Sequence, residues 1–92
     1  MSEQELFEKN LVLTTEFDRY LLEHPEVAER IPLNAQIVLL PDDDPDLSQK
    51  NREIAAAQRE PSQPVVYVRI QQLAPALSRL VNPQITVEAA SR

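Results

Sequence analysis

Glycine is absent from the 92 residues of this chain, although an average chain of this length would carry about six. Loops that cradle phosphate rely on glycine, because it allows a tight turn and a close approach of the backbone to the ligand. The sequence therefore excludes a P-loop and a GxGxxG dinucleotide site. Its turns must use the eight prolines together with asparagine and aspartate.

Cysteine is also absent, and histidine occurs once, as His24. The lack of cysteine excludes disulfides, cysteine-ligated zinc, iron–sulfur clusters and thiol nucleophiles. The single histidine leaves no histidine-rich metal site, and its place before Pro25 favours a role at a helix end. No serine has the flanking pattern of a nucleophile. We therefore expect no cofactor and no catalytic residue.

Long apolar runs and basic clusters are missing as well. No run of about 18 apolar residues predicts a membrane span, and the acidic start differs from the basic start of a secretory signal. The net charge is −6, whereas nucleic-acid binding needs clustered lysine and arginine. We expect a cytoplasmic protein that binds neither nucleic acid nor membranes. Its charged partners, if it has any, should be basic proteins.

Apolar residues at helical spacing predict a long first helix. Ser2 and Glu5 form a capping-box pattern at its start. Pro25 disfavours a helical conformation at His24, so the helix should end at about Glu23. Residues 25–30 should add a short helical turn. The apolar face of the long helix contains Leu6, Leu13, Phe17, Tyr20 and Leu21.

A strand, a helix and a second strand follow. Residues 35–40 form a short apolar run without alternation, as in a strand that is buried on both faces. Asp44 followed by Pro45 predicts a helix that runs to about Arg59, with Asn51 beside its narrow apolar stripe. Residues 64–70 are rich in β-branched and aromatic side chains and form the clearest strand. This order predicts a βαβ unit with parallel strands and a right-handed crossover.

The remaining residues predict two short elements. Residues 75–81 favour a short helix, residues 84–87 favour a brief strand, and residues 88–92 should be frayed. The sequence thus predicts a single α/β domain over residues 1–92. It should contain a long N-terminal helix, a βαβ unit with parallel strands and a short C-terminal strand, in a small sheet covered by helices. Such a short chain buries only roughly 60–65% of its unfolded surface, so a partner subunit would help.

Four aspartates after the first strand form one candidate site: Asp42, Asp43, Asp44 and Asp46. Ligands of open α/β sheets gather at the carboxyl ends of strands, and carboxylates can hold Mg²⁺. One hypothesis is therefore a small Mg²⁺-dependent enzyme or phospho-acceptor that uses Asp42, Asp43 and Asp44. The alternative is a solvated turn, in which Asp44 caps the helix and Asp46 meets its dipole. We favour the turn and expect no metal site, because the second strand ends without a lysine, serine or threonine.

The apolar face of the first helix is the other candidate site. Leu6, Leu13 and Tyr20 are seven residues apart, and Phe17 lies at a complementary heptad position. Covering the sheet explains most of this face. Three more apolar residues lie outside it: Leu11, Val12 and Leu22. We therefore predict a non-enzymatic interaction or accessory protein that forms a homo-oligomer, with a two-fold dimer as the expected form and this helix as the interface.

Three segments carry a resemblance to a known family. They are residues 16–26 (EFDRYLLEHPE), residues 37–45 (IVLLPDDDP) and residues 63–70 (QPVVYVRI). The chain resembles, over about residues 3–70, a family of small prokaryotic proteins classed as a domain of unknown function. The resemblance implies no activity and no functional residue, and it is in keeping with a prokaryotic cytoplasmic setting.

Overall fold

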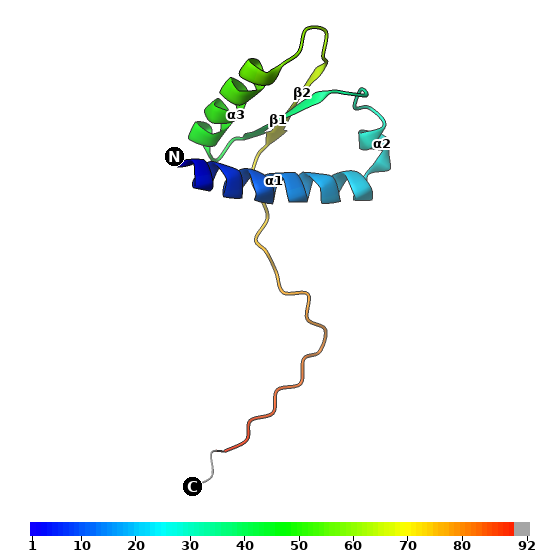
Figure 1. Cartoon of the computed structure of the whole chain (residues 1–92). Helices are drawn as coiled ribbons and strands as arrows, with labels where there is room; N and C mark the ends of the chain where they lie inside the picture. The colour runs from blue at the N-terminus through cyan, green and yellow to red at the C-terminus, as the bar shows by residue number, and fades with distance from the viewer. Residues whose placement is uncertain (90–92) are drawn as a thin grey trace.

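The computed structural model describes residues 1–89, which begin with the long helix α1 (Glu3–Glu23), drawn in blue in Figure 1. The Ser2 hydroxyl accepts a hydrogen bond of 3.1 Å from the Glu5 amide, as the capping box predicts. At the other end, the His24 amide donates to the Tyr20 carbonyl. Helix α2 (Pro25–Ala28) follows at once and is shorter than the predicted turn of residues 25–30.

The predicted βαβ unit is confirmed. It consists of β1 (Gln36–Pro41), α3 (Pro45–Gln58) and β2 (Val65–Ile70). The two strands pair in parallel, with Leu39 opposite Val68, and form a two-stranded sheet. Each boundary lies within about one residue of the predicted one, which is the usual precision of helix and strand ends.

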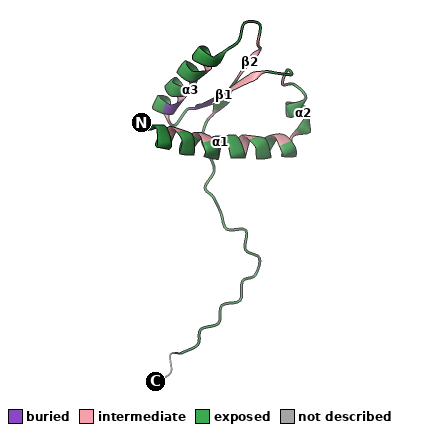
Figure 2. Cartoon of the chain, in the orientation of Figure 1, coloured by how far each residue is buried: buried purple, intermediate pink, exposed green. Residues whose placement is uncertain are grey.

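The core lies where α1, β1 and α3 meet. Leu13 of α1, Leu39 of β1 and Leu47 of α3 form its central cluster. Figure 2 shows the buried residues concentrated in β1 and at the start of α3. In the described chain, the buried apolar residues are Leu13, Val38, Leu39, Leu40, Pro41 and Leu47. This small core is consistent with the thin margin expected for a chain of this length.

Helix α1 packs lightly for its length. Leu13 is its one buried residue, and Leu6 and Phe17 are partly buried against the core. Several large apolar residues of the helix remain exposed: Phe7, Leu11, Val12, Tyr20 and Leu22. The helix therefore covers the sheet with one narrow face and leaves apolar side chains in water elsewhere.

The tail after β2 differs from the prediction. Residues 71–89 form a tail that extends away from the body, which consists of residues 1–70, as the orange to red segment of Figure 1 shows. The helix predicted for residues 75–81 and the C-terminal strand predicted for residues 84–87 are both wrong for this structure. A helix shorter than about 12 residues is marginal without a surface to pack on, and residues 71–89 form no pairing with β1 or β2. Of the end predicted to be frayed, residues 90–92 lie outside the described chain.

Candidate functional site

The acidic loop after β1 binds two separate parts of the chain. An Asp42 carboxylate oxygen lies 3.2 Å from an Arg69 guanidinium nitrogen on the neighbouring strand. Asp44 Oδ2 lies 2.9 Å from Lys9 Nζ on α1. Asp44 Oδ1 accepts a hydrogen bond of 3.1 Å from the Leu47 amide, so Asp44 is the predicted N-cap of α3.

The contact between Lys9 and Asp44 shifts the protonation of both groups. The hydrogen bond from Lys9, helped by the Leu47 amide, lowers the pKa of the Asp44 carboxyl below its ordinary value. The same hydrogen bond raises the pKa of the Lys9 ammonium. Both shifts favour the charged forms, so Lys9 and Asp44 form an ion pair between α1 and the start of α3 at neutral pH.

The aspartates of the loop do not converge on one point. Asp42 turns to β2, Asp44 turns to α1 and α3, and Asp43 is exposed. Within residues 1–89, no group of three or more histidine, cysteine, aspartate or glutamate side chains is placed to hold a metal ion. The structure therefore does not bring Asp42, Asp43 and Asp44 together as ligands of one Mg²⁺ ion.

A groove with a volume of about 740 Å³ lies between the second half of α1, α2 and β2. Its apolar walls come from all three elements and include Leu13, Phe17, Tyr20, Val27, Val66 and Val68. The strand register explains the β2 wall, because Val66 and Val68 share the sheet face of Leu39, which packs on Leu13. Glu16 and Arg19 also line the groove and form an ion pair of 3.0 Å. The groove thus has apolar walls and charged groups along α1.

The four predicted interaction residues are divided between the core and the groove. Leu13 is 6% exposed, and Leu6 and Phe17 pack against its cluster. Tyr20 is 47% exposed, and its ring stacks on His24 with centroids 4.0 Å apart. His24 Nδ1 also lies 3.0 Å from the Tyr20 carbonyl oxygen, in keeping with its expected place at the helix end. Leu13, Phe17 and Tyr20 line the groove together.

A pair of asparagine side chains, which no local sequence pattern pointed to, joins three elements. Asn51 Nδ2 donates to Asn10 Oδ1 at 2.9 Å and to the Leu39 carbonyl at 2.8 Å. Asn10 Nδ2 donates back to Asn51 Oδ1 at 2.9 Å. The available signal was a polar residue beside the apolar stripe of each helix. The two residues are 41 positions apart, so the sequence alone did not pair them.

These features define a small protein with a βαβ unit, a long flanking helix and an open apolar groove. The chain belongs to DUF5647, a protein family of unknown function whose model matches residues 5–83. This match confirms the resemblance to a family of unknown function and extends it beyond β2. No curated protein and no solved structure is significantly similar to the chain. In residues 1–89, no helix has the length and apolar character needed to cross a membrane.

Proposed function

We propose that this protein is a non-enzymatic interaction or accessory protein that acts as a homo-oligomer, in the form of a two-fold dimer. The observation that carries the proposal is the groove between α1 and β2. Its apolar walls belong to a chain with few buried residues, so covering the groove would remove apolar surface from water. A second copy is the partner that is always present, and closed two-fold symmetry is the commonest arrangement of such pairs.

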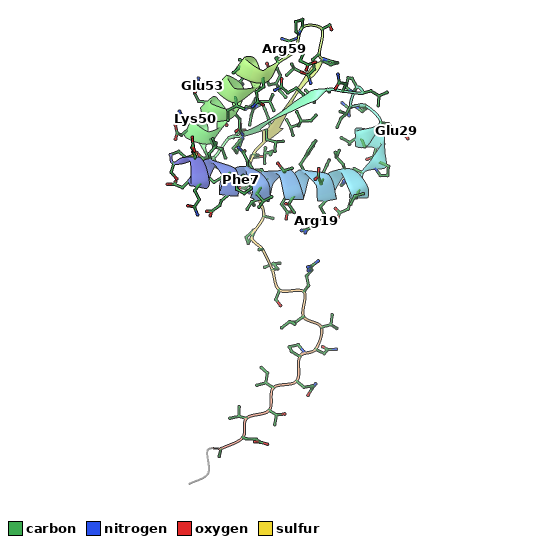
Figure 3. All side chains as sticks on the ribbon, viewed as in Figure 1. Phe7, Arg19, Glu29, Lys50, Glu53 and Arg59 are labelled. Carbon is green, nitrogen blue, oxygen red and sulfur yellow. The ribbon has the colours of Figure 1, made fainter. Side chains whose placement is uncertain are left out.

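Further apolar side chains are exposed on α1 outside the groove. Phe7, labelled in Figure 3, is exposed together with Leu11 one helical turn later. Leu22 is exposed near the end of the helix. None of these three side chains lines the groove, and a scattered exposed apolar residue is ordinary in a folded protein, so the groove alone carries the proposal.

A basic protein is a further partner that the charge of the chain favours. The net charge is −6, and complementary charge speeds association and selects partners. Some surface charge is already paired: Lys50 and Glu53, on the outer side of α3 in Figure 3, are 3.9 Å apart. The proposed compartment is the cytoplasm, since small secreted domains commonly depend on disulfides and this chain has no cysteine.

Size exclusion coupled to light scattering tests the homo-oligomer. At about 100 μM, far above the dissociation constant of a stable dimer, the full chain should have twice its mass of 10.5 kDa. Tyr20→Asp, which places a charge in the groove, should shift the mass towards the monomer. Leu33→Asp is the matched control, because Leu33 is 93% exposed and does not line the groove. A wild-type mass of 10.5 kDa would contradict the proposal.

A further inference from the structure

The tail beyond β2 carries large apolar side chains at helical spacing. Leu77, Leu80 and Val81 are 83%, 74% and 85% exposed. They occupy positions i, i+3 and i+4, which fall on one face of a helix. Polar residues fall on the opposite face: Ser78, Arg79 and Asn82. Residues 75–81 therefore have the pattern of a helix that packs on an apolar surface, although they are exposed in the single chain.

The family match includes most of this tail. The matched region runs to residue 83, whereas β2 ends at Ile70. The segment with the helical pattern thus belongs to the unit that the family shares. A flexible linker would need no such apolar pattern, because linkers are typically polar or rich in glycine and proline.

The groove lies beside the point at which the tail leaves the sheet. Leu73 and Ala74 line the groove together with Val68 and Ile70 of β2. The apolar wall of the groove therefore continues into the first residues of the tail. A helix formed by residues 75–81 has the apolar face that this wall would accept.

The backbone favours the groove of another chain over the tail's own groove. To enter its own groove, the tail would have to reverse direction at residues 74–75. Pro75 disfavours the helical conformation at Ala74, so the backbone there favours an extended conformation. In Figure 1 the tail continues away from the body.

The charge of the tail bears on the association of two copies. Residues 1–70 contain seven basic and fourteen acidic side chains, whereas residues 71–92 contain two basic and one acidic. Two acidic bodies repel each other, and a tail of opposite net charge reduces that repulsion when it lies on the other body.

We infer that residues 75–81 of one copy fold as a helix in the groove between α1 and β2 of a second copy, so that the two copies exchange tails. This inference rests on the proposed homodimer and names the segment that fills its groove. It also explains why a segment with a helical pattern is extended in the single chain, since a short helix needs a packing surface.

Full-length variants in the tail test the exchange by mass. Leu77→Asp combined with Leu80→Asp should lower the mass from twice 10.5 kDa to 10.5 kDa at about 100 μM. Both side chains are exposed, so the body should keep its far-UV circular dichroism. Leu33→Asp, on an exposed loop, should retain the wild-type mass. A dimer that survives the double substitution overturns the exchange and leaves the proposed homodimer standing.

A spin label distinguishes exchange from a tail that folds back. The chain has no cysteine, so Ser78→Cys gives one labelling site in the tail. Spin-labelled chains without nitrogen-15 are mixed with wild-type chains that carry it. The amide signals of Val66 and Val68 in the wild-type chains should then lose intensity, because the spin label of a neighbouring chain lies close to them. In a second sample, chains that carry both the spin label and nitrogen-15 are diluted in unlabelled wild type. If the signals lose intensity in this sample only, the tail occupies its own groove. That result overturns the exchange, and a monomeric wild type overturns both proposals.

Discussion

Asn51 links the three elements that build the core. Its side chain satisfies the Leu39 carbonyl and the Asn10 amide in a buried position. When one partner of a buried hydrogen bond is removed, the other polar group stays buried with neither water nor protein as its hydrogen-bond partner, which destabilises the fold. We predict that Asn51→Ala lowers the free energy of unfolding by about 1–3 kcal/mol, measured by urea denaturation.

The double-mutant cycle provides the control for this prediction. Asn10→Ala should cost less, because Asn51 would keep its bond to the Leu39 carbonyl. The effects of the two substitutions should not add, with a coupling of about 0.5–3 kcal/mol, as for residues in one network. Additive effects, or an unchanged urea midpoint for Asn51→Ala, would contradict the proposed role of the pair.

Asp44 combines a cap with an ion pair, and the two contributions can be separated. Asp44→Ala removes both and should lower the unfolding temperature by about 4–8 °C, the effect of losing roughly 1 kcal/mol in a domain of this size. Asp44→Asn keeps a good capping residue but removes the charge that binds Lys9. The asparagine variant should therefore be more stable than the alanine variant at neutral pH. Equal unfolding temperatures for the two variants would show that the cap contributes nothing.

The pH dependence of the same residue has a defined sign. The pKa of Asp44 is lower in the folded chain, chiefly because its carboxylate accepts a hydrogen bond from Lys9. Its contribution to stability is therefore complete above the ordinary pKa of about 4 and is lost as the pH falls through the lower folded value. We predict that the difference in unfolding temperature between wild type and Asp44→Asn narrows below about pH 4. A difference that stays constant down to pH 2 or so would contradict the assignment.

At the scale of elements, local signals predicted most of the fold. The capping box at Ser2, the proline at Pro45 and the β-branched run of β2 each specify an element through neighbouring residues. The contact between Asn10 and Asn51 joins distant parts of the chain, so no local pattern identified it. The groove was not predicted for a related reason, since it depends on how α1, α2 and β2 are placed in space. The helix of the tail was predicted wrongly because a helix this short is marginal unless it packs on a surface, and residues 75–81 are exposed in the described structure.

Helix α1 also shows which of its apolar residues hold the body together. Leu13 is buried in the core cluster, whereas Leu11 is exposed on the same helix. Leu13→Ala should lower the free energy of unfolding by about 2–5 kcal/mol, the usual cost of emptying a core position. Leu11→Ala is the matched control and should change it by no more than about 0.5 kcal/mol, measured below the concentration of association. Similar losses for the two variants would contradict the packing of α1 on the sheet.

The whole molecule exposes an apolar groove and an apolar tail on a body with a small core, and both bear on its stability. If folding and association are coupled, the unfolding temperature must rise with protein concentration, because the dimer is favoured by mass action. Each tenfold rise in concentration adds about 1.4 kcal/mol per dimer, which corresponds to roughly 3–6 °C when it is shared between two chains of this size. We predict this increase for wild type by calorimetry. The variant with Leu77→Asp and Leu80→Asp should unfold at one temperature throughout the same series. A wild-type unfolding temperature that does not depend on concentration would mean that the body folds without a partner.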